Sequence, residues 1–101
     1  MQTIKYNNIF DAVTENEEEA SELQTRADLM IVIREIVEEN GWKQSEAAKK
    51  LSLTQPRVSD LLNGKIEKFS IDLLMTCLFR LGFRVKPSYI NHKLTMAVQA
   101  A

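Results

Sequence analysis

Two side chains in the stretch LTQPRVSDLLNGK (residues 53–65) are of the types that bind the edges of DNA bases. A Gln can form two hydrogen bonds with adenine, and an Arg can form two with guanine. Gln55 and Arg57 stand at the start of a short predicted helix, the part of a recognition helix that reaches base edges. We interpret both as candidate base readers. Arg57 is equally suited to a phosphate, a contact that strengthens binding without reading sequence.

Side chains for catalysis or metal binding are not grouped in this sequence. It contains no paired carboxylates, Ser-His-Asp set or glycine-rich phosphate loop, and its single histidine, His92, lies near the C-terminus. The single cysteine, Cys77, has no Cys or His at metal spacing, so we expect it to be a small core residue. We predict no enzymatic activity, no catalytic residue, no metal and no cofactor.

Two short helices joined by a tight turn must position Gln55 and Arg57. The first helix is predicted at Gln44–Leu51, and the second begins at Thr54 or Gln55 as its N-cap and runs to Asn63. Pro56 is tolerated only in the first turn of that helix, where its missing N–H has no intrahelical partner. Such a pair forms a helix-turn-helix unit, whose second helix fits the major groove of DNA.

The flanking segments complete one small domain. Residues 16–40 have apolar residues at three- and four-residue steps, which predicts an amphipathic helix, and a further helix is predicted from Ser70 to Gly82. The alternation of apolar and basic residues in Phe83–Lys86 predicts a strand that Pro87 ends. A lone strand of this length is unstable, so its partner is either a strand at Ile4–Tyr6 or the same strand of a second copy.

The net charge of −1 conceals two halves of opposite sign. Residues 1–40 hold 3 basic and 10 acidic side chains, whereas residues 41–101 hold 10 basic and 4 acidic ones. The basic half suits a polyanion, and the acidic half either faces solvent or binds a basic protein. The sequence has no apolar stretch that would span a bilayer and no apolar signal core, so we expect a cytoplasmic protein without membrane contact.

These patterns predict a mainly all-α chain, a helix-turn-helix repressor-like bundle of five helices or fewer with a short C-terminal β-strand. We expect residues 1–15 to be a flexible N-terminal segment. Residues 16–87 would be the DNA-binding domain with its dimerising strand. Residues 88–101 would be a tail that is disordered or forms a short helix.

Residues 43–65, KQSEAAKKLSLTQPRVSDLLNGK, resemble the helix-turn-helix of the Cro/repressor (XRE) family. Across residues 7–86, NNIFDAV, EEASEL, RADLMIVIREI, GWKQSEAAKKL, QPRVSDLLNGK, FSIDLL and LGFRV are similar to the HigA-type antitoxin-like subgroup. The resemblance implies base contacts by Gln55, Arg57, Ser59 and Asp60, phosphate contacts by Gln44, Asn63 and Lys65, and core positions for Ala48, Leu51, Val58 and Leu61. Asp60 also suits the role of a local charge partner.

Three residues depart from the family pattern. Lys43 stands where the family usually has a Thr cap, which costs about 1 kcal/mol of helix stability. Ser52 replaces the usual turn glycine, so it must take a positive φ or the turn must adjust. Pro56 occupies a position that carries a base-contacting Gln in many relatives, and it offers only an apolar contact to a thymine methyl.

We predict a sequence-specific DNA-binding transcriptional regulator, the antitoxin of a type II toxin-antitoxin pair that represses its own operon. It would bind a palindromic operator in double-stranded DNA as a homodimer, with its acidic half, Asn16–Glu39, against a basic RNase toxin. Two alternatives are a stand-alone XRE-family or phage-like repressor without a toxin, and a protein-interaction adaptor with the same fold. The candidate DNA-binding residues are Gln44, Thr54, Gln55, Pro56, Arg57, Ser59, Asp60, Asn63 and Lys65.

Overall fold

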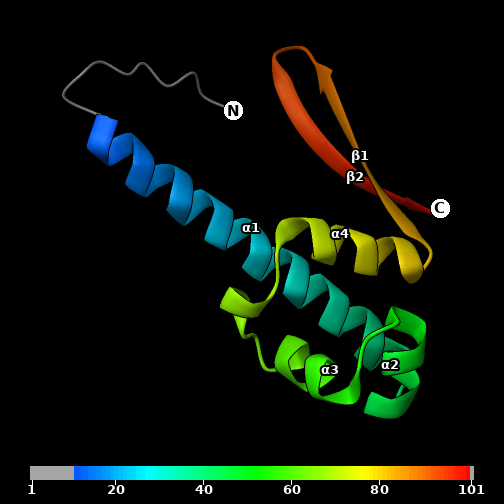
Figure 1. The fold of residues 1–101 in the computed structure, drawn as a ribbon. Coiled ribbons are helices and arrows are strands. Elements are labelled where there is room, and N and C mark those ends of the chain that lie inside the picture. Colours follow the sequence, from blue (N-terminus) through cyan, green and yellow to red (C-terminus); the bar gives the residue numbers. More distant parts are fainter. Residues whose placement is uncertain (1–10, 101) are drawn as a thin grey trace.

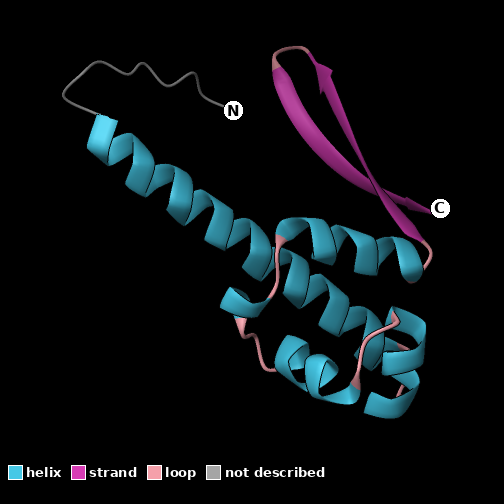
Figure 2. Ribbon diagram, viewed as in Figure 1, coloured by secondary structure: helices cyan, strands magenta, loops and turns pink. Residues whose placement is uncertain are grey.

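The computed structural model describes the backbone of residues 11–100 and the side chains of residues 16–100. Its elements are α1 (Asp11–Glu39), α2 (Gln44–Leu51), α3 (Gln55–Leu62), the 3-10 helix η2 (Ile66–Lys68), α4 (Ile71–Arg80), β1 (Phe83–Ile90) and β2 (Lys93–Ala100). In Figure 1, α2, α3 and α4 gather around the second half of α1, while the first half of α1 and the hairpin project away. The mainly helical fold with a small C-terminal β-structure is confirmed (Figure 2).

Helix α1 begins earlier than the sequence predicted. Residues 11–15, which we expected to be part of a flexible segment, belong to the helix, and the predicted flexibility of residues 1–10 lies outside the described residues. The first part of α1 has no apolar periodicity, so the prediction began at Asn16.

The hydrophobic core lies where the second half of α1 meets the three shorter helices. Its buried members are Met30, Ile33 and Val37 of α1, Ala47, Ala48 and Leu51 of α2, Val58 and Leu61 of α3, and Phe69, Leu74, Cys77 and Leu78. The predicted core positions in the helix-turn-helix are therefore confirmed. Cys77 is also a core residue as expected, and its burial raises the pKa of its thiol more than nearby Arg80 and Arg57 lower it.

The turn between α2 and α3 uses a strained serine. Ser52 adopts a left-handed conformation with φ 55° and ψ 43°, one of the two outcomes that its replacement of glycine predicted. Thr54 is the N-cap of α3, and its Oγ1 accepts a hydrogen bond from the Arg57 backbone N–H at 3.4 Å. The alternative cap, Gln55, is instead the first helical residue. Pro56 follows it in the first turn, as predicted.

The C-terminal segment differs most from expectation. Strand β1 pairs with β2 through a two-residue turn, so the tail that we predicted to be disordered or helical is a strand. This local pairing gives β1 a partner that the sequence did not suggest. The predicted partner strand Ile4–Tyr6 lies outside the described residues, and pairing with a second copy stays a prediction. The turn residues Asn91 and His92 both have positive φ, at 53° and 63°, as a type I′ hairpin turn requires.

Pro87 lies inside β1 and does not end it. In a hairpin closed by a two-residue turn, the pair next to the turn is hydrogen-bonded and the pairs then alternate. Counting from Ile90 and Lys93, Pro87 and Met96 form a non-hydrogen-bonded pair. The position of the missing N–H therefore faces the open edge, which is where strands tolerate proline.

The register gives the hairpin two chemically different faces. The apolar face consists of Phe83, Val85, Pro87 and Tyr89 opposite Ala100, Val98, Met96 and Leu94. The polar face consists of Arg84, Lys86, Ser88 and Ile90 opposite Gln99, Ala97, Thr95 and Lys93. On the polar face, the Ser88 and Thr95 hydroxyls lie 2.9 Å apart in a cross-strand hydrogen bond. The hairpin packs on the bundle chiefly through β1 against α4.

No helix within residues 11–100 is long and apolar enough to cross a membrane.

Candidate nucleic-acid interface

The N-terminus of α3 presents three predicted site residues to solvent. Gln55 and Pro56 occupy the first turn and are exposed, and the Thr54 cap before them is exposed as well. The first N–H groups of a helix have no intrahelical partner, so Pro56 costs no hydrogen bond here. Val58 and Leu61 anchor the opposite side of the helix in the core. The helix therefore offers Gln55 on a rigid support.

Arg57 does not extend freely from α3. Its Nη1 donates a hydrogen bond to the Lys68 carbonyl at 3.1 Å, and its guanidinium carbon lies 4.6 Å from the centre of the Phe69 ring. These contacts hold the half-buried side chain against the segment after α3. A guanidinium has five N–H donors, so others are left for DNA. Arg57 thus has a structural role that the sequence did not reveal.

Asp60 is a local charge partner. Its carboxylate lies 3.2 Å from the Lys68 ammonium and 3.7 Å from that of Lys65. The Lys65 backbone N–H also donates to the Asp60 carbonyl at 3.0 Å. A carboxylate engaged by two ammonium groups is poorly placed to accept from a cytosine. Of the two roles considered for Asp60, the geometry favours the local partner.

Ser59 and Asn63 lie together on one face of α3. The Asn63 side-chain amide donates to the Ser59 hydroxyl at 3.3 Å, and Asn63 is the C-cap of the helix. Asn63 and the Lys65 side chain are exposed, as is Gln44, which begins α2. The structure therefore places the three predicted phosphate-binding residues at helix ends on the surface.

Lys43 keeps half of the usual cap of α2. A lysine side chain cannot accept a hydrogen bond. The Lys43 backbone N–H instead donates to the Glu46 Oε1 at 2.9 Å. This is the backward contact of a capping box, and it preserves part of the stability that the missing threonine would give.

Two arginines that the sequence analysis missed cap the C-termini of the helix-turn-helix. Arg34 of α1 donates to the Leu62 carbonyl of α3 at 3.2 Å. Arg80 at the end of α4 donates to the Leu51 carbonyl of α2 at 2.8 Å. The last carbonyls of a helix lack intrahelical donors and carry partial negative charge, so a guanidinium stabilises them. The pairs are separated by 28 and 29 residues, and no local pattern signals them.

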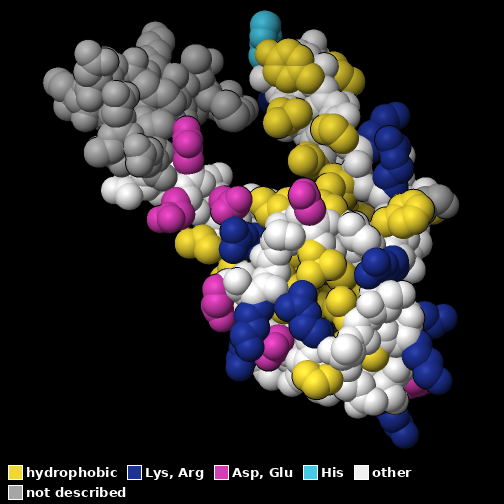
Figure 3. All heavy atoms as spheres, in the orientation of Figure 1, with side chains coloured by type: hydrophobic (Ala, Val, Ile, Leu, Met, Phe, Trp, Pro, Cys, Tyr) yellow, Lys and Arg dark blue, Asp and Glu magenta, His cyan; other side chains and the backbone are white. Residues whose placement is uncertain are grey.

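Positive charge concentrates around the two short helices. From Lys43 to Lys68 the chain has 6 Lys and Arg residues against 3 Asp and Glu residues. Figure 3 shows the dark blue side chains over the end of the molecule that carries α2 and α3, and magenta ones along the free part of α1. The Lys50 ammonium nitrogen lies 5.5 Å from the centre of the ring of half-buried Trp42. A surface of this kind attracts a phosphate backbone.

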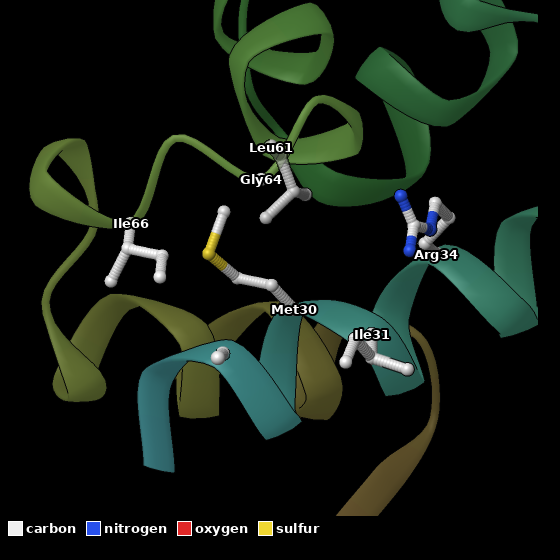
Figure 4. Close-up of a pocket in the computed structure, with 7 residues that line it drawn as sticks. Met30, Ile31, Arg34, Leu61, Gly64 and Ile66 are labelled. Carbon is white, nitrogen blue, oxygen red and sulfur yellow. The ribbon is translucent and has the colours of Figure 1, made fainter. Parts of the chain in front are cut away.

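A small pocket lies behind α3, between α1 and the loop after α3 (Figure 4). Its volume is about 180 Å³, and it is lined mainly by Met30, Ile31, Arg34, Leu61, Gly64 and Ile66. The lining is apolar except for Arg34, whose guanidinium donates to Leu62. No group of three potential metal ligands occurs among the side chains described. The pocket thus provides no convergent set of reactive groups.

Comparisons with known proteins agree with this geometry. Residues 12–88 match the sequence profile of a family described as a helix-turn-helix domain. The chain is also similar to a solved structure named as an XRE-family transcriptional regulator, with 33% identity and a TM-score of 0.64. That match covers 74% of this chain and 82% of the other. No curated protein matches the chain.

Proposed function

The chain is a DNA-binding regulator that belongs to the XRE family of helix-turn-helix proteins, and we propose that it represses its own operon by reading a palindromic operator as a dimer. The observation that supports sequence reading is the exposed first turn of α3, where Gln55 stands on a helix anchored in the core. The surrounding basic side chains supply the sequence-independent part of the affinity.

The proposed contacts divide into two kinds. Gln55 contacts a base edge and Pro56 an adjacent thymine methyl, because both are exposed in the first turn. Gln44, Asn63 and Lys65 contact phosphates and set the position of α3 on the duplex. Arg57 contacts DNA through those guanidinium N–H groups that do not donate to the Lys68 carbonyl. Thr54 and Ser59 complete the contact surface.

A single helix-turn-helix reads only a half-site, so two copies must act together on a palindrome. The dimer contact is proposed at α4 and the strand around Val85, which lie away from α3 in Figure 1. An antitoxin role rests on the resemblance to HigA-type proteins and on the exposed acidic residues of α1. Its partner would be a basic, RNA-cleaving toxin, and co-purification with the product of the neighbouring gene tests that pairing.

Fluorescence anisotropy of the full chain tests the DNA-binding proposal. The ligands are the DNA upstream of its own gene and a scrambled duplex, each titrated with salt. We expect a preference of about 10³ or more for the upstream DNA, with affinity that falls as salt increases. Equal, weak binding to both duplexes would contradict sequence reading and favour the adaptor, which keeps the fold without a DNA target.

Gln55→Ala then tests the base contact. Loss of a bidentate base contact costs about 1–3 kcal/mol on the specific site and almost nothing on scrambled DNA. Gln55 is the better choice because Arg57 also holds Lys68 and Phe69. Gln99→Ala is the matched control, since Gln99 is an exposed glutamine on the hairpin. An equal effect of the two substitutions would exclude Gln55 as a reader.

A further inference from the structure

The hairpin carries an apolar face that its own bundle covers only in part. All four cross-strand pairs on that face are apolar. Val85, at the inner end, is half-buried against the core, but Tyr89 is 68% exposed, Met96 62% and Leu94 52%. A two-stranded hairpin is marginal alone, and its outer half here has no further strand among the described residues. A contiguous apolar surface in that position marks an interaction site.

An open groove continues this face. It has a volume of about 380 Å³ and lies between α1, α4 and the hairpin. Leu29 and Val32 of α1, Met75 of α4, and Val85, Met96 and Val98 of the hairpin line it. Yellow side chains line the side of the hairpin that borders this space in Figure 3. The apolar face of the hairpin therefore looks into the groove.

The charges around the groove are complementary to the back of the same hairpin. Glu18 precedes Thr25, a groove residue, by seven positions, so it lies on the same side of α1 two turns further out. Glu17 and Glu22 flank it and are also exposed. The polar face of the hairpin carries three basic side chains, Arg84, Lys86 and Lys93. A hairpin inserted with its apolar face against the resident hairpin would turn this basic face toward acidic α1.

We propose that the groove holds the hairpin of a second copy of this chain, so that two copies exchange hairpins around a two-fold axis. The proposal rests on the dimeric regulator proposed above and specifies its interface. Each copy supplies both the acidic α1 and the basic hairpin, so one symmetric contact satisfies both grooves at once. The apolar faces form the centre of the interface, and the charged pairs form its rim.

Two exposed apolar residues on opposite faces provide the first test. Met96 lies on the apolar face and Ile90 on the polar face, and they are 62% and 67% exposed. Analytical ultracentrifugation of the 11.6 kDa chain should show a dimer. Met96→Lys should raise the dimer dissociation constant by roughly 100-fold, since a buried apolar anchor is lost. Ile90→Lys should not weaken the dimer, because a further positive charge on the polar face suits the acidic α1 of the second copy. Equal thermal melting of both variants at monomeric concentrations excludes misfolding.

Charge reversal provides the second test. Glu17→Lys with Glu18→Lys makes one variant, and Lys86→Glu with Lys93→Glu makes the other. Each variant alone should dimerise about tenfold more weakly, because like charges then face each other at the rim. An equimolar mixture should recover the wild-type dissociation constant, since each hairpin then meets an α1 of opposite charge. A mixture that stays monomeric would overturn the exchange.

Other results would also overturn the proposal. A wild-type chain that stays monomeric at all concentrations would assign the groove to another occupant, such as residues 1–10 or a basic toxin. Equal weakening by Met96→Lys and Ile90→Lys would place the dimer contact elsewhere. DNA binding of the same samples separates the two proposals. Preference for the upstream DNA with a dimeric Met96→Lys variant keeps the function and rejects the exchange. The expected dimer without that preference keeps the exchange and rejects the function.

Discussion

The helix-turn-helix buries its apolar residues, whereas the hairpin leaves many of its own exposed. Helix α3 buries Val58 and Leu61 completely, and its polar side chains are bonded locally, as in the contacts of Asp60. The hairpin leaves Met96 and Tyr89 exposed. The first element is well packed within one chain, and the side chains it leaves exposed in its first turn are Gln55 and Pro56. The second leaves apolar surface uncovered, which is why we propose it as the contact with a second copy.

Helix α1 repeats the same contrast along its length. Its second half buries Met30, Ile33 and Val37 against the short helices. Its residues 16–25 are all exposed, and acidic side chains are frequent among them. The buried half packs against the short helices, whereas the exposed half, like the outer part of the hairpin, leaves its side chains in solvent. The chain thus consists of a well-packed helix-turn-helix end and an end that leaves apolar surface exposed.

The largest expected effect compares one leucine from each region. Leu61 is 1% exposed and Leu94 is 52% exposed. Leu61→Ala should lower the free energy of unfolding by about 2–5 kcal/mol, because it leaves a cavity under α3. Leu94→Ala should change it by less than about 0.5 kcal/mol at concentrations where the chain is monomeric. Urea unfolding followed by far-UV circular dichroism measures both. Similar losses would show that the hairpin is as well packed as the core.

The sequence predicted the helix-turn-helix well because its signals are local. The Thr54 cap, Pro56 in the first turn and the Asn63-Gly64 stop all act within a few residues, and the structure confirms each. The spacing of Val58 and Leu61 likewise predicted the buried side of α3. A short amphipathic helix in a compact domain is therefore readable from one stretch of chain.

The contacts between distant segments were not predictable in the same way. The position of Arg57 alone suggested a base reader, yet its guanidinium donates a hydrogen bond to the Lys68 carbonyl and lies over the Phe69 ring. The caps formed by Arg34 and Arg80 join segments that only the tertiary fold brings together. The hairpin was missed because Pro87 suggested an end to β1, and a turn without glycine gives a weak signal.

Arg80→Met should have an intermediate effect on the free energy of unfolding. Arg80 is the last residue of α4, between the helix-turn-helix and the hairpin. The Leu51 carbonyl would lose the hydrogen bond that the guanidinium donates at 2.8 Å. An unsatisfied, partly buried carbonyl costs about 1–3 kcal/mol, so the free energy of unfolding should fall by that amount. Arg84→Met is the matched control, because Arg84 is exposed on the polar face of the hairpin. Equal urea midpoints for the two variants would show that the Arg80 contact adds nothing to stability.

The smallest expected effect concerns the turn of the hairpin, where His92 has φ 63°. An L-residue in this conformation costs about 1–2 kcal/mol, and Asn-Gly is the preferred type I′ turn. His92→Gly should therefore stabilise the hairpin by about 0.5–1 kcal/mol, after the greater unfolded-state entropy of glycine is included. Hydrogen exchange of the strand amides should slow by roughly two- to fivefold.

His92→Ala is the control, because it loses the edge contact with Tyr89, whose ring centre lies 6.5 Å away, but keeps the strain. Faster exchange in the alanine variant with slower exchange in the glycine variant would identify backbone strain as the cause. Equal exchange in both would assign the effect to the lost ring contact, and the hairpin would then depend on its side chains even at the turn.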